Sequence, residues 1–277
     1  VDMVEEGINV VVSHGNGPQV GMINNAFAYA SANDGKTPEM PFPEAGAMSQ
    51  GYIGYQLSQA ILNELKRRDI MRSSVALITQ TVVDANDPAF QDPTKPVGAF
   101  LTEDEAVRLA NETGATFKED AGRGWRQVVP SPKPVDVVEK DMVNTLVDSG
   151  YVVITVGGGG IPVVKKDGRL VGTPAVIDKD FASAKLAELI HAEMLVILTA
   201  VDRVAINWGK PDQKALAEMT VDEAEKYCGE GHFAPGSMLP KVQAAMSFAK
   251  AGGTAIIASL ENAAAALRGE SGTRIVK

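Results

Sequence analysis

The feature that most limits the folds open to this chain is its alternation of apolar runs with helical patterns. The runs 9–12 and Tyr151–Val156 are apolar at nearly every position, as is typical of strands buried on both faces. Segments of helical periodicity separate such runs, and the longest repeats a large aliphatic residue every four positions from Ile53 to Leu65. Strands that alternate with helices predict a mainly parallel sheet covered on both sides.

These patterns predict a series of elements along the chain, without an internal repeat or a low-complexity tract. Strands are expected at Ile8–Ser13, Ser74–Thr79, Tyr151–Val156, Met194–Thr199, Thr254–Ala258 and Thr273–Val276. Helices are expected at Pro18–Tyr29, Ala47–Arg68, Thr102–Thr113, Val137–Ser149, Asp180–His191, Val221–Cys228, Ser237–Lys250 and Glu261–Arg268. The stretch 84–134 breaks the alternation with six prolines, together with Gly122 and Gly124. We therefore expect an excursion from the main sheet there.

Charge and cysteine content narrow the function classes. The 277 residues include 26 Lys and Arg against 35 Asp and Glu, a formal net charge of −9, which argues against broad binding to nucleic acid or to a membrane surface. The longest apolar stretch, Tyr151–Val164, contains four glycines and is too short to span a bilayer. Cys228 is the only cysteine, so the chain forms no internal disulfide, which fits a cytoplasmic location.

Two glycine-rich stretches directly follow predicted strands. Ser13–Pro18 indicates either a tight strand-to-helix turn or a loop whose amides bind an anion at a helix N-terminus. Gly157–Gly160 holds more glycines than a plain turn needs, and ordering each costs about 0.5–1 kcal/mol relative to alanine. Close approach by a ligand explains this excess better than a flexible connector, because ligands bind at the carboxyl ends of parallel strands.

Two lysines stand where predicted helices open. Lys179 lies between Asp178 and Asp180, and Lys241 follows Pro240 in a first helical turn. A positive charge there opposes the helix dipole, and a solvated charge cluster is the simpler interpretation of Asp178–Asp180. Both positions become favourable if a phosphate binds. Phosphoryl transfer depends mainly on positioning and charge neutralisation, which lysines, loop amides and Mg²⁺ supply.

Other chemistries have little support in the sequence. His14, His191 and His232 lack metal-ligand spacing, and Cys228 lacks a nearby Cys or His pattern. The chain contains no Gly-x-Ser-x-Gly elbow and no dinucleotide fingerprint. A hydrolase of that type and a dehydrogenase are therefore weak hypotheses.

At these residues the sequence resembles the carbamate kinases of the amino-acid kinase family. The matching stretches lie in order over nearly the whole chain: Ser13–Gly21, Gly46–Tyr55, Asp92–Gly98, Gly122–Arg126, Val129–Pro134, Gly157–Val163, Ala175–Asp180, Leu198–Asp202, Asn207–Pro211 and Gly236–Val242. Together they are far more specific than any one glycine loop.

The resemblance implies a three-layer α/β/α sandwich with a mainly parallel central sheet and a small protruding lid subdomain at about 88–134. It implies one amino-acid kinase domain over 1–277, in which about 150–277 form the nucleotide-binding half. The implied activity is reversible transfer between carbamoyl phosphate and ADP, which gives carbamate and ATP with Mg²⁺ as cofactor. A cytoplasmic homodimer in arginine or agmatine catabolism is the further expectation.

The resemblance also implies roles for individual residues. Lys179 and Lys241 would neutralise the transferring phosphoryl group, Asp180 would orient both lysines, and Lys95 would reach the phosphate from the lid. The expected substrate-binding residues are Gly15, Asn16, Gly17, Gly157 and Gly158. The expected nucleotide-binding residues are Ala200, Asp202, Trp208, Lys210, Ala234, Gly236, Ser237 and Met238. No protein ligand to a metal is expected.

One departure from the family pattern lies at the front of the sequence. Family members begin with a first strand and a Gly-Gly-Asn loop that meets the phosphates, whereas Val1 falls at what resembles the end of the first helix. The resemblance thus indicates an N-terminally truncated domain, and the polypeptide as printed is expected to be poorly active or unstable.

Two alternatives remain open at this point. A sibling amino-acid kinase that forms another acylphosphate would share the fold, although Asp92–Pro96 favours the carbamate branch. A non-catalytic nucleotide-binding protein would keep the pocket, although the presence of Lys179, Asp180 and Lys241 argues against it.

Overall fold

The structure is a computed structural model that describes residues 1–120 and 122–277. It divides into two compact units: a larger unit, Val11–Lys179, and a smaller unit, Val1–Val10 with Asp180–Lys277. The division falls between Lys179 and Asp180, inside the charged motif Asp178–Asp180. Each unit has its own sheets and its own buried side chains.

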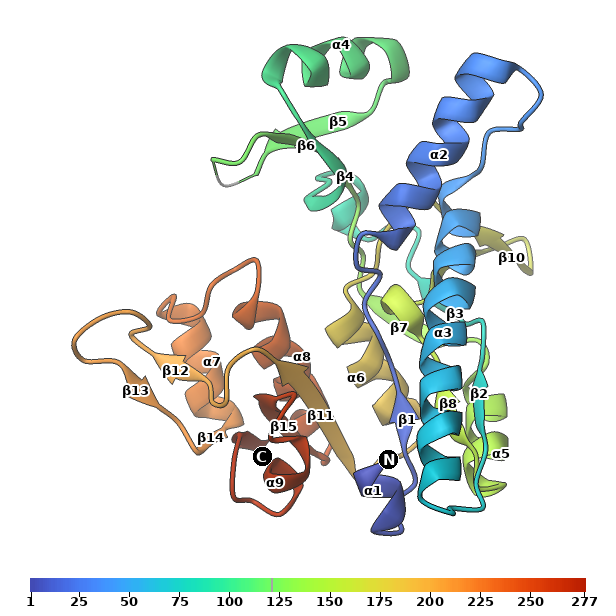
Figure 1. The fold of residues 1–277 in the computed structure, drawn as a ribbon. Coiled ribbons are helices and arrows are strands. Elements are labelled where there is room, and N and C mark those ends of the chain that lie inside the picture. Colours follow the sequence, from blue (N-terminus) through green and yellow to red (C-terminus); the bar gives the residue numbers. More distant parts are fainter. Residues whose placement is uncertain (121) are drawn as a thin grey trace. The chain divides into compact units, whose positions relative to one another are not determined.

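A three-stranded parallel sheet runs through the larger unit. Its order is β1 (Val11–Val12), β8 (Val152–Ile154) and β2 (Ser74–Ala76). All of β8 is buried, which explains its continuously apolar sequence. Helix α3 (Phe42–Arg67) packs against β2 and β8, and α5 (Lys140–Asp148) packs against β8 (Figure 1).

A second sheet of the larger unit has the order β10 (Arg169–Gly172), β9 (Ile161–Lys166), β3 (Gln80–Val83) and β7 (Pro134–Val137). The central strands β3 and β9 are parallel, whereas both edge strands are antiparallel to their neighbours. The sequence patterns predicted none of these four strands. Apart from the β9–β10 hairpin, their pairing joins segments that are far apart in the chain, and β10 is exposed along its whole length.

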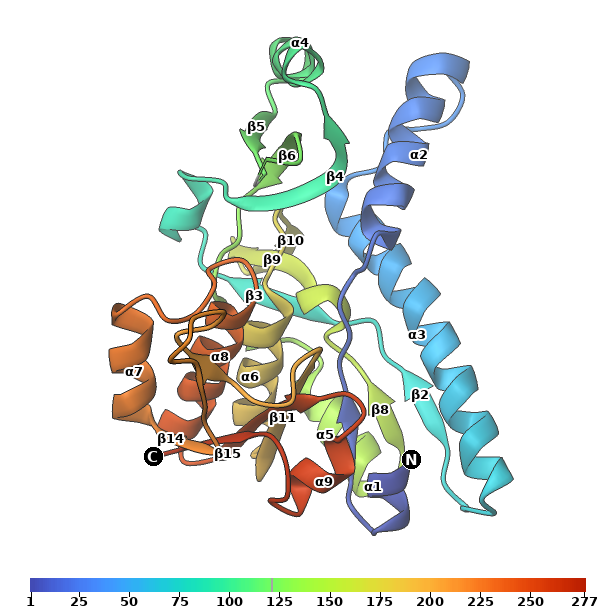
Figure 2. The ribbon, with the colours of Figure 1, turned by 60° about the vertical axis from the view of Figure 1, so that its left-hand side comes forward.

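The predicted excursion contains a small antiparallel sheet, β4 (Lys95–Leu101), β6 (Trp125–Val129) and β5 (Thr116–Glu119), with α4 (Glu103–Thr113) packed on β5 and β6. We call this segment the lid. It projects from the rest of the larger unit beside α2 (Gln19–Asp34), which contacts β4 (Figure 2). Residue 121 of the predicted lid lies outside the described residues. A capping box of Thr102 and Glu105 starts α4, as such pairs do.

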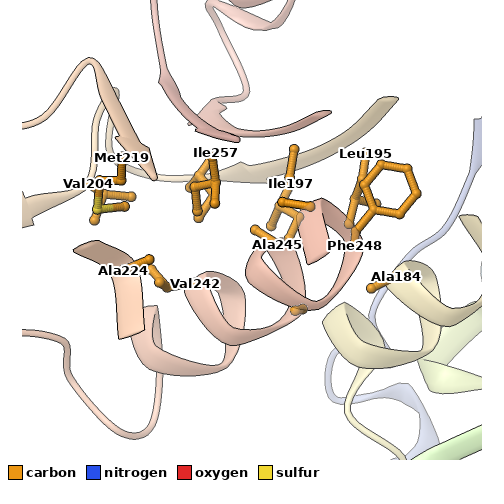
Figure 3. Close-up of a cluster of buried hydrophobic side chains, with 14 of the residues drawn as sticks. Ala184, Leu195, Ile197, Val204, Met219, Ala224, Val242, Ala245, Phe248 and Ile257 are labelled. Atoms are coloured by element: carbon orange, nitrogen blue, oxygen red, sulfur yellow. The ribbon is translucent and has the colours of Figure 1, made fainter. Parts of the chain in front are cut away.

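The smaller unit is built on a sheet of order β11 (Met194–Thr199), β15 (Thr254–Ser259), β16 (Thr273–Val276) and β14 (Glu218–Thr220). Side chains of β11, β14 and β15 meet α7 (Val221–Gly229), α8 (Met238–Lys250) and the end of α6 (Lys179–Leu189) in one buried core (Figure 3). Ile256 and Ala258 of β15 face the other way and pack on Ala266 of α9 (Ala263–Leu267). The sheet is therefore covered on both faces, as period-two alternation in a central strand allows.

The remaining elements are short. They are α1 (Asp2–Glu5), the 3-10 turns η1 (Pro88–Phe90) and η2 (Gly157–Gly159), and the two-stranded ribbon of β12 (Ala205–Ile206) and β13 (Lys214–Ala215). The ribbon belongs to a connecting segment of the smaller unit, between β11 and β14.

The predicted α/β sandwich with parallel strands is confirmed, and β11 and β16 have the expected bounds. Several boundaries were wrong. The strand expected at Ile8–Ser13 is reduced to β1. The helix expected from Ala47 starts at Phe42, because Pro43 in its first turn fits the fixed φ of proline. The helix expected from Val137 starts at Lys140, because Val137 pairs with Thr81 as the last residue of β7. Helix α2 runs beyond Tyr29 to Asp34, where Gly35 ends it in the left-handed conformation. Helix α9 is shorter than the predicted Glu261–Arg268.

Candidate active site

The larger unit contains a cavity of about 660 Å³ where several predicted site residues meet. Its lining comes from the loop after β1 with the start of α2, from the lid, from the glycine loop after β8, and from the segment before α6. The lining residues are Gly15, Asn16, Gly17, Pro18, Val20, Gly21, Met22, Asn25, Lys95, Pro96, Val97, Gly98, Ala99, Arg126, Gly158, Val176, Ile177, Asp178 and Lys179. Six predicted residues, Gly15, Asn16, Gly17, Lys95, Gly158 and Lys179, thus share one cavity.

Parallel pairing of β1 with β8 brings the two glycine-rich loops together. The carbonyl of Val12 accepts a hydrogen bond from the amide of Thr155 at 2.9 Å, and the carbonyl of His14 accepts one from the amide of Gly158 at 2.7 Å. Both loops therefore leave the same edge of one sheet, as the carboxyl ends of parallel strands must.

The four glycines of the second loop are required by the protein's own packing. A Cβ added at Gly157 would collide with the His14 ring, and one at Gly158 with the Asn16 side chain. At Gly159 it would meet the Ile177 carbonyl, and at Gly160 the Thr81 hydroxyl. Ligand approach is therefore not needed to explain the excess of glycines. Gly158 still lines the cavity, whereas the predicted substrate-binding Gly157 is not among its lining residues.

Buried polar side chains fix the position of this loop. The Gln50 side chain donates to the Thr79 carbonyl at 3.1 Å and accepts from the Thr79 amide at 2.8 Å. The hydroxyls of Thr79 and Thr155 lie 2.7 Å apart, and the amide of Val156 donates to Thr79 Oγ1 at 3.1 Å. Each of these threonines and Gln50 is almost fully buried, so these bonds are costly to lose.

The first loop is held by its own contacts. His14 Nδ1 lies 2.8 Å from the Gly15 carbonyl, which makes this nitrogen the donor and leaves Nε2 as an acceptor. Partial burial lowers the pKa of His14, and the bond to Gly15 opposes this shift. Burial of His14 therefore favours its neutral imidazole form. Asn16 Oδ1 accepts a long hydrogen bond of 3.5 Å from the buried hydroxyl of Ser49.

The lysines of the larger unit approach the cavity from two sides. Lys95 Nζ, at the start of β4, lies 2.8 Å from Asp178 Oδ2. The side chain of Lys179 passes over Gly15, because a Cβ added there would stand 3.2 Å from Lys179 Cδ. A side chain at this position would require the lysine to shift by a few tenths of an ångström.

Arg126 and Asp178 were not among the site residues expected from the sequence, although both lie in stretches that match the carbamate kinases. Arg126 donates to the Gly98 carbonyl at 3.1 Å, pairs with Asp120 at 3.2 Å and stacks over the Phe100 ring at 5.0 Å. Its Nε is buried without a hydrogen-bond partner within the described residues. The signal that could have found Arg126 is the Gly122–Arg126 motif, because arginine is common where anions bind.

The smaller unit holds the second predicted lysine. Lys241 Nζ, in the first turn of α8, lies 2.8 Å from Asp180 Oδ2 in α6. The side chains are only 13% and 9% exposed. Such a pair is stable only when both charges remain paired, since removing one partner leaves a buried charge uncompensated.

The residues predicted to bind nucleotide lie on exposed loops of the smaller unit, apart from the partly buried Met238. Ala200 and Asp202 follow β11, and Trp208 and Lys210 follow β12. Ala234, Gly236 and Ser237 precede α8, and Met238 is its first residue. The Ala234 carbonyl accepts from the amides of Ser237 and Leu239 at 3.2 and 3.1 Å, which shapes the turn into the helix.

Asp202 is engaged by the protein itself. Its Oδ1 accepts hydrogen bonds from Asn262 Nδ2 at 2.9 Å, from the Ser259 hydroxyl at 3.3 Å and from the Ser271 hydroxyl. These bonds, led by that of Ser271, lower the pKa of Asp202. Asp202 therefore ties the loop after β11 to the loops that follow β15 and precede β16.

The part of the chain that the structure describes lacks two kinds of feature, a cluster of metal ligands and a membrane-spanning helix. No group of three or more His, Cys, Asp or Glu side chains within residues 1–120 and 122–277 is arranged to hold a metal ion. Among the same residues, no helix combines the length and apolar character needed to cross a membrane.

Comparisons with known proteins agree with this geometry. The model of the amino acid kinase family matches residues 1–259. The carbamate kinase of Clostridium perfringens is 58% identical over 278 residues, which cover 100% of this chain and 88% of that protein. The carbamate kinase-like protein YqeA of Escherichia coli is 55% identical, with 99% and 89% covered.

A solved structure shows the same fold. Carbamate kinase from Giardia lamblia bound to AMP-PNP superposes with a TM-score of 0.92 at 46% identity, over 100% of this chain and 87% of that one. These similarities extend over the whole fold and include the loops that line the cavity. The chain belongs to the amino acid kinase family, within its carbamate kinase branch.

Proposed function

We propose that this protein is a carbamate kinase that transfers a phosphoryl group reversibly between carbamoyl phosphate and ADP, giving carbamate and ATP. The observation that carries the proposal is the arrangement at Asp178–Asp180. Asp178 holds Lys95 in the larger unit, Asp180 holds Lys241 in the smaller unit, and Lys179 between them lines the cavity. Carbamate kinases that are 58% and 52% identical to this chain over its whole length support the same conclusion.

The chemistry asks for positive charge and fixed amides rather than a nucleophilic side chain. In our proposal Lys179 and Lys241 neutralise the transferring phosphoryl group, and Lys95 reaches it from the lid. Asp180 orients both lysines, and its carboxylate lies 2.8 Å from Lys241 Nζ. Gly15, Asn16 and Gly17 cradle the carbamate end, together with the amide edge of Gly158. Gly157 supports the site indirectly, because the absence of a side chain there leaves room for the His14 ring.

Mg²⁺ fits this scheme as part of the metal–nucleotide complex. Mg²⁺ keeps several waters and binds through one or two carboxylates plus substrate phosphates. When bound, it would neutralise charge on the nucleotide phosphates, while the protein's lysines act on the group in transfer.

We also propose where the nucleotide binds and which residues form the lid. We place ADP or ATP against the loops of the smaller unit that carry Ala200, Asp202, Trp208, Lys210 and Ala234–Met238. The exposed ring of Trp208 on the short ribbon offers a stacking surface. We propose residues of about 88–134 as the lid and about 150–277 as the nucleotide-binding half.

We further propose a homodimer that forms through the outer face of α3. Met48, Tyr52, Tyr55 and Leu62 are exposed there at successive spacings of four, three and seven, which gives one apolar stripe. The edge strand β2 lies beside this helix. Negative charge introduced by Tyr52→Glu and Tyr55→Glu should yield a monomer in analytical ultracentrifugation. We expect a cytoplasmic role in arginine or agmatine breakdown for this dimer.

The decisive test is ATP formation from ADP and carbamoyl phosphate with Mg²⁺, in a coupled assay. Lys179→Ala is the paired variant, and Lys185→Ala on the same helix is the matched control. Turnover that disappears only in the first variant supports both the activity and the role of Lys179. A folded, ADP-binding protein without turnover would instead favour a sibling acylphosphate kinase, identified by a substrate panel, or a binding protein.

A further inference from the structure

Asp178 lies where the lid joins the body of the larger unit. Its Oδ2 pairs with Lys95 Nζ at 2.8 Å, and the side chain of Asp178 is only 14% exposed against 37% for Lys95. A charge-assisted bond to a largely desolvated carboxylate is stronger than an ordinary surface pair. The outgoing strand of the lid is therefore fixed at its first residue.

The returning connection of the lid approaches the same carboxylate through Lys133. The carboxylates of Asp178 and Asp87 act on the Lys133 ammonium and favour its charged form, although partial burial lowers the pKa of Lys133 overall. The Lys133 amide donates to Asp87 Oδ2 at 2.9 Å, while Asp87 Oδ1 caps η1 through the amide of Ala89 at 2.8 Å. Asp87 thus joins the two lid connections.

A backbone bond completes the cluster. The amide of Val176 donates to the carbonyl of Pro130 at 2.9 Å, which ties the segment carrying Asp178 to the returning chain. Both connections of the lid and the segment before α6 consequently meet around one carboxylate. Of the Lys–Asp pairs in the lid, only Lys95–Asp178 lines the cavity within the described residues.

We propose that Asp178 is a positioning residue that holds Lys95, and with it the first strand of the lid, at the rim of the cavity. This inference rests on the proposed function, in which Lys95 must present its charge to a phosphoryl group. A free lysine side chain samples many rotamers, and Asp178 restricts them before substrate arrives. The phosphate then meets an ammonium that is already in place.

The experiment compares Asp178→Asn with Asp92→Asn. The Asp92 carboxylate pairs with Lys118 at 2.7 Å in the same lid but does not line the cavity, so it is the matched control. We expect Asp178→Asn to raise KM for carbamoyl phosphate about threefold to thirtyfold, with a smaller change in kcat. Asp92→Asn should leave both constants unchanged.

A double-mutant cycle then separates positioning from direct action. In a Lys95→Met background, Asp178→Asn should have little further effect on KM, because the side chain through which it acts is gone. An equal loss in both backgrounds, or a fall in kcat alone, would overturn the proposal. The proposal would also be overturned if the rise in KM were fully explained by a lower melting temperature of Asp178→Asn.

A measurement on the ligand-free protein keeps this inference distinct from the proposed function. Amide hydrogen exchange in β4 should rise in Asp178→Asn and not in Asp92→Asn. If the wild type shows no turnover while exchange responds as expected, the assigned function fails but the hold on Lys95 stands. If the wild type turns over and neither exchange nor KM responds, the positioning role of Asp178 is refuted.

Discussion

The substitution Gly158→Ala tests why the loop after β8 contains only glycine. Gly158 has φ +64°, and an added Cβ would collide with the amide end of Asn16. Gly168 is the matched control, because its φ is +74° and no atom lies within 4 Å of an added Cβ. The two positions share the backbone cost and differ in the collision; Gly158 is also buried, whereas Gly168 is exposed.

The magnitudes follow from these two contributions. A left-handed conformation costs alanine about 1–2 kcal/mol, part of which is offset because alanine restricts the unfolded chain. Gly168→Ala should therefore lower the free energy of unfolding by about 1 kcal/mol. Overpacking adds about 1–3 kcal/mol, so Gly158→Ala should cost about 2–4 kcal/mol.

Equilibrium urea unfolding measures both variants. Trp125 lies in the same unit as both glycines, and a Trp208→Phe background makes its fluorescence the only tryptophan signal. The double variant Asn16→Ala with Gly158→Ala should recover the collision part and leave only the backbone part. If Gly158→Ala costs no more than Gly168→Ala, yet raises KM, then ligand approach rather than internal packing requires the glycine.

Three further outcomes follow from the structure. Gln50→Leu should lower the free energy of unfolding by about 1–3 kcal/mol, since it orphans the buried amide of Thr79, whose carbonyl still accepts from the Ile161 amide at 2.8 Å; an unchanged urea midpoint would contradict this. Asp202→Asn should lower Tm at pH 7. Because the folded pKa of Asp202 is below its usual 3.8, its contribution is present above that pH and is lost as the pH falls through the folded value. The Tm difference between wild type and variant should therefore vanish in acid, and a constant difference would refute the assignment. Lys241→Met should abolish turnover and lower the free energy of unfolding by about 3 kcal/mol, because the buried carboxylate of Asp180 loses its ion pair with Lys241. The double variant Lys241→Met with Asp180→Asn should recover the stability but not the activity. Calorimetry measures the stability of both variants, and the ATP assay measures their activity.

Local sequence signals predicted the elements that carry their own periodicity or caps. Helix α4 begins where Thr102 and Glu105 form a capping box, and β11 occupies the six residues that its apolar run indicated. The glycine loops and Lys179 were also found from the sequence, because their composition is costly unless something specific surrounds them. These features depend on neighbours within a few residues.

Nonlocal packing decided the rest. Val137 belongs to β7 rather than to a helix because Thr81, far away in the chain, pairs with it. The reason for four glycines lies in His14, Asn16, Ile177 and Thr81, which only folding brings near.

The sequence by itself determined the α/β class, the edge of the sheet where loops gather and the lysines suited to a phosphate. Only the tertiary structure decided which of these residues share a cavity, and that Asp178 pairs with Lys95 while Asp180 pairs with Lys241. The physical reason is that backbone preferences and apolar periodicity act over a few residues. Ion pairs and close contacts depend on distances that are fixed only when remote segments pack together.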